Sequence, residues 1–463
     1  MADGKSHILI VGAGLCGSLL ALRMAQRGHR VTLMERRPDL RKVTQDAGRS
    51  INLAFSNRGM KGMKMVGLEE EVKELCIPML GRMIHDPKGN TFLSPYSGRE
   101  GEYINSISRP GLNALLLDAA EKQDEVTIIF NQKCVGVDLE NASATFEDYS
   151  TSERSVQQGD VLIGTDGAGS VVRKAMFDHK RFLFSFSQQW LTHGYKELTI
   201  PAAEDGGFKA DKGALHIWPR GEDMLIALPN LDGSFTVTLF LPYSNSDYCF
   251  DNLTTKERVM EYFSSEFPDT LELMPELAEE FFENPTAPLG TIKCSPWHAY
   301  GKTLIMGDAA HAIVPFYGQG MNASFEDVVE FDKVLDASGD NWNEIFSAFS
   351  ESRKEDTDAI ADLAVDNFHE MKEHTANPLF QAKRKVETAL EFEFPEQYSS
   401  KYSLVTFKEH IPYSQAMRQG RAQDKAILNL LDDGLLPEDL PLEEKLKRVQ
   451  LQTKEVLHED ELL

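Results

Sequence analysis

The chain has 463 residues, and its acidic residues outnumber its basic ones 73 to 48, a formal net charge of −25. At roughly 150 residues per domain the length predicts about three domains or lobes, and a hydrophobic content of 41% excludes wholesale disorder. Nucleic acid or an anionic membrane surface is not expected as the main partner, because both attract basic patches.

The first predicted element is a short buried strand over residues 7–11, which are apolar and partly β-branched. A glycine-rich turn follows, and then a helical pattern that runs to about Arg27 and stops at Gly28. A second apolar strand covers residues 31–34. Strand, helix and strand in this order predict a βαβ unit at the start of a parallel sheet.

The turn between the first strand and the helix has a GxGxxG pattern, which predicts a dinucleotide site. Gly12 makes the tight turn, Gly14 lets the backbone approach a pyrophosphate, and Gly17 lets the helix pack closely on the strand. The phosphates would bind at the N-terminus of the helix. Glu35, 18 residues after Gly17, can accept hydrogen bonds from a ribose diol. The pattern alone does not separate NAD from FAD.

The next elements are shorter and less regular. Residues 49–53 predict a short strand, and a helix is expected from about Leu112 to Lys122, behind Arg109. Residues 125–130 and 134–139 alternate as strands do.

A second glycine turn follows the apolar strand that begins at Val161, and this turn contains Asp166 and Gly167. From about 182 to 242 the pattern changes to β-rich runs separated by Pro and Gly, which predict a separate, mostly antiparallel sheet. A further apolar strand begins at Thr303, and beyond it the pattern is largely helical to the end of the chain.

Asp308 follows that last strand and a glycine, so its carboxylate is expected at the carboxyl edge of the sheet, where α/β folds bind ligands. It could accept a hydrogen bond from the ribityl chain of a flavin, although the residues alone leave a helix N-cap as an equal alternative. Gly318 and Gly320 open the next helix, whose backbone N–H groups could stabilise negative charge on a reduced flavin ring. His311 is expected to support this turn, because no further ligands at metal-site spacing accompany it.

Taken together, the GxGxxG turn with Glu35, the Gly164–Gly167 turn and the Gly307-Asp308 pair resemble the three motifs of the single-component flavoprotein aromatic hydroxylases. Within that group the chain is similar to the kynurenine 3-monooxygenase family along almost its whole length. The segments that carry this similarity are 48–54, 81–83, 193–198, 215–219, 234–240, 314–322, 366–371 and 402–407.

The resemblance implies an α/β fold with three domains. A Rossmann-like, discontinuous FAD-binding domain would comprise residues 1–75, 100–180 and 288–335. A mostly antiparallel substrate-binding sheet domain would comprise residues 76–99 and 181–287, and a C-terminal helical region residues 336–463.

The activity implied by the resemblance is hydroxylation of L-kynurenine at ring position 3, with NADPH and O2, through a flavin C4a-hydroperoxide. FAD would be bound tightly and non-covalently. NADPH would be a transient co-substrate, because the chain has one convincing βαβ fingerprint; the residues do not choose between NADPH and NADH. A flavin hydroxylase of another aromatic acid, an FAD-dependent oxidase or dehydrogenase, and a non-enzymatic flavin-binding sensor stay open as alternatives.

The resemblance also implies the site residues, none of which is a catalytic side chain, because the flavin carries the chemistry. The implied cofactor-binding residues are Gly12, Gly14, Gly17, Glu35, Arg49, Arg109, Asp166, Gly167, Gly307, Asp308, Gly318, Gly320, Met321 and Asn322. The implied substrate-binding residues are Arg82, Tyr96, Asn367, Glu370, Met371, Tyr402, Phe240 and Phe316. A planar guanidinium suits the carboxylate of an amino acid; without the resemblance, Arg82 would be a surface charge and the tyrosines ordinary half-buried aromatics.

The five cysteines are odd in number and form no CxxC pair, so we expect free thiols in a cytoplasmic protein, and no metal site. No apolar run reaches 18 residues, and residues 431–463 are charged throughout. Animal members of the family have a hydrophobic C-terminal tether; we therefore expect the soluble, bacterial-type form without a membrane segment. A homodimer is compatible with the sequence, which does not decide the oligomeric state.

Overall fold

The structure is a computed structural model that describes residues 5–43, 52–97, 99–373 and 378–461. The chain divides into two compact units, each built from three segments. Unit 1 comprises Met1–Cys76, Ile107–Leu191 and Leu289–Ala361, and unit 2 comprises Ile77–Ser106, Thr192–Pro288 and Asp362–Leu463. This division has two units where the sequence predicted three domains, because the C-terminal helical residues are grouped with the antiparallel sheet.

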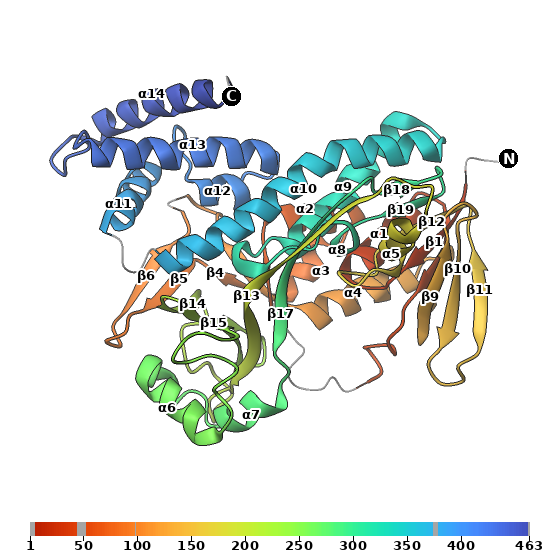
Figure 1. Cartoon of the computed structure of the whole chain (residues 1–463), viewed down its shortest axis with the longest axis horizontal. Coiled ribbons are helices and arrows are strands. Elements are labelled where there is room, and N and C mark those ends of the chain that lie inside the picture. Colours follow the sequence, from red (N-terminus) through yellow and green to blue (C-terminus); the bar gives the residue numbers. More distant parts are fainter. Residues whose placement is uncertain (1–4, 44–51, 98, 374–377, 462–463) are drawn as a thin grey trace. The chain divides into compact units, whose positions relative to one another are not determined.

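The centre of unit 1 is a six-stranded sheet in the order β18-β19-β12-β1-β2-β8 (Figure 1). All neighbours are parallel except the β18–β19 pair. The strands are β1 (His7–Val11), β2 (Arg30–Met34), β8 (Val126–Ile129), β12 (Val161–Gly164), β18 (His298–Ala299) and β19 (Thr303–Ile305). The predicted βαβ start of a parallel sheet is confirmed.

Helices cover this sheet, and the side chains of Ile8, Leu9 and Ile10 are consequently 0% exposed. The helices of unit 1 are α1 (Leu15–Gln26), α2 (Asn57–Val66), α3 (Glu69–Glu74), α4 (Arg109–Glu121), α5 (Val171–Asp178), α8 (Asp308–His311) and α9 (Gly320–Ser338), with the short 3₁₀ turn η2 (Pro315–Tyr317). α4 starts three residues before the predicted position, because the Ser108 side chain caps the N–H of Gly111 and Pro110 occupies its first turn.

A small separate sheet in unit 1 has the order β11-β10-β9, and its strands lie together in Figure 1. They are β9 (Gln132–Asp138), β10 (Ser143–Asp148) and β11 (Arg154–Gln158). Three further short strands are β3 (Asn52–Phe55), β4 (Cys76–Met79) and β7 (Ile104–Ser108). β3 overlaps the strand predicted over 49–53, of which residues 49–51 lie outside the described part of the chain.

The sheet of unit 2 belongs to a seven-stranded sheet of order β17-β13-β16-β15-β14-β5-β6, whose first strand is β17 (Ala287–Ser295). From β13 to β6 it is antiparallel apart from the β14–β5 pair, so the prediction of a mostly antiparallel sheet is confirmed. Its other strands are β5 (Gly81–His85), β6 (Thr91–Pro95), β13 (Ser185–Ile200), β14 (Ala214–Arg220), β15 (Asp223–Pro229) and β16 (Phe235–Pro242). Trp218 and Phe235 of the sheet share a core with Tyr262 of α6 (Lys256–Glu266) and Phe281 of α7 (Leu277–Glu283), with η1 (Pro268–Thr270) between these helices.

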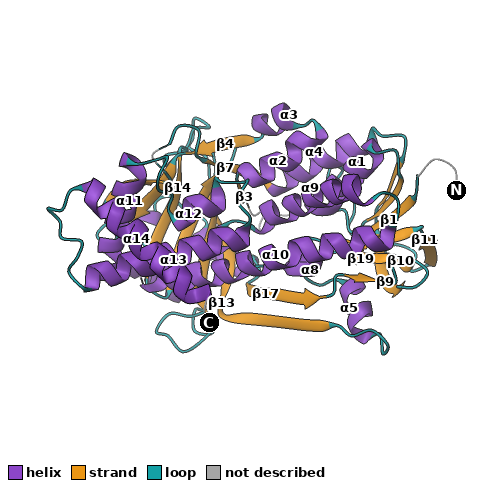
Figure 2. Ribbon diagram, turned by 90° about the horizontal axis from the view of Figure 1, so that it is seen from above, coloured by secondary structure: helices purple, strands orange, loops and turns teal. Residues whose placement is uncertain are grey.

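Four strands and one helix of the described residues continue from one unit into the other along the chain: β4, β7, β13, β17 (Ala287–Ser295) and α10 (Trp342–Glu373). The last four helices gather in unit 2, as Figure 2 shows. They are α11 (Pro378–Glu393), α12 (Lys401–Thr406), α13 (Tyr413–Asp432) and α14 (Leu442–Glu461). α11, α13 and α14 share a core that includes Leu390, Ile427 and Val449. Among the described residues, no helix combines the length and apolar character that crossing a membrane requires.

Candidate cofactor and substrate sites

The GxGxxG turn at the end of β1 needs glycine at two of its three positions. Gly12 has φ +105°, and a Cβ there would lie 2.7 Å from the carbonyl oxygen of Thr165. A Cβ on Gly17 would lie 2.0 Å from the carbonyl oxygen of Gly12. Gly14 differs, because a Cβ there would have nothing within 4 Å. The turn therefore packs tightly against the protein at Gly12 and Gly17 and leaves open space at Gly14.

Two polar side chains that the sequence interpretation missed hold this turn in place. The hydroxyl oxygen of Thr165 lies 2.8 Å from the carbonyl oxygen of Gly12 and donates to it. The side-chain amide of Asn113 in α4 donates to the carbonyl oxygen of Ala13 at 3.1 Å. Both partners are about 100 residues or more from the turn in sequence, so only the fold brings them together.

The N-terminus of α1 suits a phosphate. Its first internal hydrogen bond runs from the N–H of Ser18 to the carbonyl oxygen of Gly14, so the N–H groups of Leu15, Cys16 and Gly17 have no acceptor within the helix. No side chain caps this end and the first turn has no acidic residue. Backbone donors and the helix dipole together favour an anion at such an end.

Glu35 lies beside the same turn, as the sequence predicted. It follows β2, its side chain is buried, and one carboxylate oxygen accepts the N–H of Ala13 at 2.9 Å. The other oxygen accepts the backbone N–H and the guanidinium Nε of Arg37 at 3.0 and 2.8 Å. The carboxylate is therefore fixed at the carboxyl edge of the sheet, where a ribose diol could donate to it.

The carboxylate of Asp166 forms its hydrogen bonds with groups of the protein itself. It accepts the hydroxyl of Ser170 at 2.5 Å and the backbone N–H groups of Val171 and Val172 at 2.7 and 3.3 Å. These bonds cap α5, and burial raises the pKa of this carboxyl above its ordinary value. Gly167 next to it has φ +79° and nothing within 4 Å of a Cβ position. Any cofactor contact in this motif is therefore easier at the Gly167 backbone than at the Asp166 side chain.

Asp308 begins α8 directly after β19 and is half-buried. Gly307 before it has φ +62°, and a Cβ there would lie 3.0 Å from the sulfur of Cys16. The N–H of Gly307 donates to the carboxylate of Asp327 in α9 at 3.0 Å. The conformation of the Gly307–Asp308 turn is thus fixed by α9.

Asp327 belongs to a buried charge network that the sequence interpretation missed. It pairs with Nε2 of His311 at 2.5 Å and with Nε of Arg353 at 2.9 Å. Arg353 and Arg58 both pair with Glu326, at 3.1 and 2.7 Å. Burial acts to raise the pKa of Asp327, but the charges of His311 and Arg353 outweigh it and hold the pKa below its ordinary value. As predicted, His311 supports the turn.

The loop before α9 presents backbone donors. Gly318 has φ +66°, and a Cβ there would lie 2.9 Å from the Cβ of Ala54. The first internal bond of α9 joins the N–H of Ala323 to the carbonyl oxygen of Gln319, so the N–H groups of residues 320–322 have no acceptor within the helix. These N–H groups could donate hydrogen bonds to the electron-rich edge of a flavin ring.

The side chain of Asn322 is used entirely within this loop. Its amide group donates to the carbonyl oxygens of Ala54 and Gly318 at 2.8 and 2.9 Å, and its oxygen accepts the N–H of Ser56 at 3.0 Å. Asn322 therefore shapes the loop, and only its backbone could reach a cofactor. Met321 beside it is half-buried against the core of unit 1.

The other cofactor candidates are less constrained. Arg109 is exposed at the start of α4. Arg49 lies outside the described residues. Together these features fit a dinucleotide with a flavin ring. The open N-terminus of α1 fits its pyrophosphate, the fixed Glu35 carboxylate fits its ribose, and the backbone donors of the α9 loop fit the ring.

In unit 2 the structure brings together three of the predicted substrate residues. The guanidinium carbon of Arg82 lies 4.3 Å from the ring centre of Tyr402 and 5.4 Å from that of Tyr96. The two tyrosine rings are stacked, with centres 5.6 Å apart and planes 12° from parallel. The hydroxyl of Tyr96 is buried and has no hydrogen-bond partner in the described residues. Burial and Tyr402 raise its pKa, and Arg82 acts in the opposite direction.

Of the remaining substrate candidates, Phe316 is half-buried in η2 of unit 1, and the others belong to unit 2. Asn367 and Glu370 are one turn apart on α10, and Glu370 pairs with Lys401, which precedes Tyr402 in α12. Met371 also lies on α10, but its side chain is not among those the structure describes. Phe240 is buried in β16, 6.4 Å from the ring centre of Tyr195.

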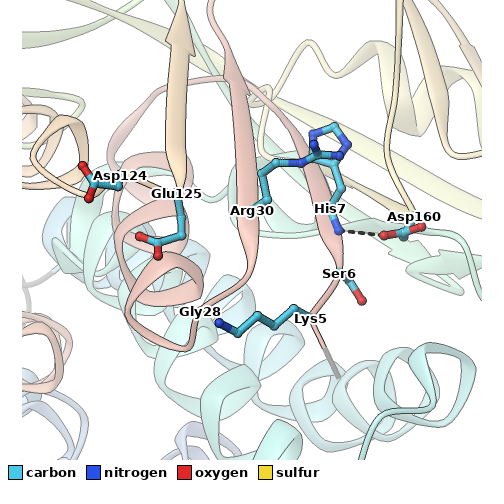
Figure 3. Close-up of a pocket in the computed structure, with 8 residues that line it drawn as sticks. All are labelled: Lys5, Ser6, His7, Gly28, Arg30, Asp124, Glu125 and Asp160. Carbon is cyan, nitrogen blue, oxygen red and sulfur yellow. Dashed lines mark hydrogen bonds between the residues drawn. The ribbon is translucent and has the colours of Figure 1, made fainter. Parts of the chain in front are cut away.

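A pocket in unit 1 lies away from all these motifs (Figure 3). Its lining includes Lys5, Arg30, Glu125 and Asp160, and the carboxylate of Asp160 accepts the backbone N–H of His7 at 2.7 Å. These residues stand at the amino ends of the parallel strands, whereas the glycine turns stand at the carboxyl ends. Because ligands of such sheets bind at the carboxyl ends, this pocket is not the dinucleotide site.

Comparison with known proteins agrees with this geometry. A family model described as an FAD binding domain matches residues 5–362. Kynurenine 3-monooxygenase from Myxococcus xanthus is 48% identical over 93% of this chain and 92% of its own, and that from Dictyostelium discoideum 44% identical over 92% and 93%. The enzyme of the same name from Anopheles gambiae is 41% identical over 93% of this chain and 88% of its own.

Two solved structures share the fold at low sequence identity. The tetrameric form of 2-methyl-3-hydroxypyridine-5-carboxylic acid oxygenase has a TM-score of 0.64 and 19% identity, covering 86% of this chain and 99% of that one. PqsL from Pseudomonas aeruginosa has a TM-score of 0.63 and 17% identity, covering 82% and 99%. The chain therefore has the fold of the FAD-binding aromatic hydroxylases, with the mixed α/β architecture and C-terminal helices that the sequence predicted.

Proposed function

The chain belongs to the kynurenine 3-monooxygenase family of FAD-binding proteins, and from this membership we propose its reaction and the residues that support it. The enzyme is an FAD-dependent monooxygenase that hydroxylates L-kynurenine at ring position 3. NADPH is the reductant and O2 the oxidant; one oxygen atom enters the ring and the other leaves as water.

FAD supplies the redox and oxygen-transfer chemistry, and the chain supplies its binding site. The N–H groups at the start of α1 hold the pyrophosphate, and Glu35 accepts the ribose hydroxyls. Asp308 accepts a hydrogen bond from the ribityl chain. The N–H groups of residues 320–322 stabilise negative charge on the reduced ring, because they already point from a helix end fixed by Asn322.

Arg82, Tyr96 and Tyr402 bind the amino-acid end of kynurenine. The observation that carries this assignment is the buried Tyr96 hydroxyl, whose proton has no acceptor among the described residues and whose oxygen is approached by the Arg82 guanidinium, itself held on two aromatic rings. A buried donor without an acceptor costs free energy, so a carboxylate that accepts from both groups would be bound favourably. Asn367 and Glu370 of α10, Met371, and the apolar Phe240 and Phe316 complete the proposed substrate residues.

The test is product formation by the purified, FAD-loaded protein. We expect kynurenine to stimulate NADPH oxidation, and each equivalent of NADPH to yield 3-hydroxykynurenine. Stimulation without that product would reject the proposed reaction. A panel of other aromatic acids addresses the nearest alternative, and labelled O2 addresses an oxidase or dehydrogenase, which would form product without incorporating the label.

Two properties of the whole protein belong to the same proposal. The protein works in the reducing cytoplasm, which the five free cysteines support: four are buried, and none is in a disulfide. It also forms a homodimer, for which the next subsection gives the surface.

A further inference from the structure

The first half of β13 has an open edge. β13 has β17 on one side and β16 on the other, but the pairing with β16 begins only at His193, opposite Pro242. Residues 185–191 are therefore paired on the β17 side alone, and Figure 2 shows β13 lying outside β17 along this stretch. No loop or helix in the described part of the chain forms a backbone hydrogen bond with these residues.

The backbone groups that face this edge follow from the neighbouring pairing. The N–H of Tyr243 donates to the carbonyl oxygen of Thr192 at 3.0 Å, so the backbone groups of Thr192 point to the β16 side. Backbone groups alternate between the two edges of a strand. Phe186, Gln188 and Trp190 consequently direct their N–H and C=O groups to the open edge, and their side chains share one face.

The side chains along this edge are exposed and uncharged. All residues from 185 to 190 are exposed, including Phe186 at 36% and Trp190 at 58%. Residues 182–195 contain no charged residue, although the chain has a net charge of −25. Proteins ordinarily protect an open strand edge with charges, prolines or bulges, because such an edge pairs readily with another strand. This edge has none of these protections.

We propose that residues 185–191 pair antiparallel with the same residues of a second copy of this chain, about a two-fold axis at Gln188. In this register Gln188 faces Gln188 of the second copy, and Phe186 faces Trp190 of the second copy on both sides of the axis. Each of these residues directs its backbone groups to the open edge, so the facing pairs close reciprocal hydrogen bonds. The aromatic pairs and the central amides add cross-strand contacts.

The charge distribution favours a second copy over an oppositely charged partner. A basic protein would find no acidic side chain along this edge to pair with. Two copies that each have a charge of −25 repel one another, and residues 182–195 bring no acidic side chain to the interface; the charge that does lie beside it is Arg173, whose guanidinium carbon is 5.3 Å from the ring centre of Phe186 and opposite in sign to the net charge of the second copy. The same patch used on both sides closes after two subunits, as two-fold interfaces do.

A disulfide placed on the axis tests the register. Hydrogen-bonded antiparallel neighbours have Cα atoms about 5.5 Å apart, which lies within the range for disulfides. The holoenzyme with Gln188→Cys should therefore form a covalent dimer under mild oxidation, at twice the 51.9 kDa mass of the chain on a non-reducing gel. Ser185→Cys is the matched control, because its two copies would be about 20 Å apart along the strands. The wild-type protein shows the background from the five native cysteines.

Removing one edge donor tests the interface without cross-linking. Gln188→Pro deletes an N–H that has no internal acceptor, and proline is tolerated at such an edge position. We expect the wild-type holoenzyme to sediment as a dimer at micromolar concentration, and Gln188→Pro to weaken dimerisation at least 100-fold with an unchanged melting temperature. If Gln188→Pro misfolds, Gln188→Lys replaces it, since two ammonium groups would meet on the axis.

Three results would overturn the proposal. The first is a wild-type protein that stays monomeric at these concentrations. The second is a dimer that survives Gln188→Lys or a folded Gln188→Pro. The third is cross-linking of Ser185→Cys as efficient as that of Gln188→Cys.

Discussion

The backbone N–H of Gly307 donates a 3.0 Å hydrogen bond to the buried carboxylate of Asp327, 20 residues later in the chain. The same carboxylate pairs with His311 and Arg353, so the turn that presents Asp308 is anchored in a charge network with no exposed member among those three. The proposed binding of the ribityl chain by Asp308 would therefore depend on a side chain in a different helix.

Asp327→Asn should weaken FAD binding and the fold together. The substitution leaves Arg353 buried without one of its counter-charges, and breaking a buried ion pair costs about 3–5 kcal/mol. We expect the FAD dissociation constant, measured by flavin fluorescence, to rise at least 10-fold. Asp332→Asn in the same helix is the control: it removes the pairs with Arg23 and Arg27, which are remote from the Gly307 turn. An equal loss of FAD affinity in both variants would contradict the positioning role of Asp327.

Two glycine substitutions should separate binding from folding. Gly14→Ala places a methyl group in open space, in an extended backbone conformation, so the protein without FAD should keep its melting temperature to within a few degrees. The methyl group would occupy the path of the pyrophosphate, and the FAD dissociation constant should rise at least 10-fold.

Gly17→Ala is the counterpart to this variant. Its methyl group would lie 2.0 Å from a backbone oxygen, so the protein should be strongly destabilised even without the cofactor. Circular dichroism melts of the FAD-free proteins measure both effects. A Gly14→Ala protein that binds FAD normally would exclude the pyrophosphate from this turn.

Tyr96→Phe should reduce substrate affinity without cost to stability. The substitution removes a buried hydroxyl that has no partner, so the free energy of unfolding should stay constant or rise slightly. Loss of a hydrogen bond to a charged carboxylate costs about 1.5–3 kcal/mol, which predicts a roughly 10- to 100-fold rise in the KM for kynurenine. Arg82→Ala should raise KM further and leave FAD bound.

Tyr398→Phe provides the matched control for Tyr96→Phe. The Tyr398 hydroxyl is also buried without a partner, but it lies in the core of the C-terminal helices. The variant should match Tyr96→Phe in stability and the wild type in KM. Equal KM values for the two tyrosine variants would argue against a carboxylate at Tyr96.

Asp223 should make unit 2 less stable as the pH rises. Burial raises the pKa of this carboxyl from 3.8 to about 7, with Glu266 and Glu222 adding to the effect. A raised pKa means that the folded state binds the proton more tightly than the unfolded state. The contribution of Asp223 to stability is therefore greatest below pH 4, falls as the pH rises to about 7, and is constant above that.

The size of this effect is roughly 2–4 kcal/mol, because one pKa unit corresponds to about 1.4 kcal/mol and the side chain is partly exposed. Asp223→Asn should remove most of this pH dependence and stabilise the protein at pH 8. Urea unfolding at pH 5 and pH 8, for the wild type and the variant, measures it. Identical pH profiles for the two proteins would refute the assignment.

Local patterns predicted those parts of the fold that depend on neighbours in sequence. The strand at 7–11, the helix that stops at Gly28 and the strand at Thr303 are each defined by a run of apolar residues with a glycine or a polar residue after it. The three glycine turns were predictable for the same reason, and at Gly12, Gly17, Gly307 and Gly318 a positive φ or a close contact requires glycine.

Long-range polar contacts were not predictable in this way. Arg58 and Glu326 are separated by 268 residues, and each appears in sequence as one more charge on a helix. The roles of Asp166 and Asn322 also depend on three-dimensional contacts, because their side chains cap a helix and brace a loop. A motif marks where the cofactor-binding backbone lies, but it does not say which polar side chains are already used by the protein.

The three-segment construction of unit 1 has a consequence for biosynthesis. β1 has β12 as a parallel neighbour, and the turn at Gly307 is anchored by Arg353 through Asp327. At about 5–20 residues per second, a ribosome needs roughly 20 to 70 s to proceed from β1 to Arg353. For the first part of that interval the GxGxxG helix lacks β12, and throughout it lacks the helix that carries Arg353. FAD binding must therefore be one of the last events in the maturation of the nascent chain. The edge of β1 that pairs with β12 stays unpaired until β12 has been synthesised.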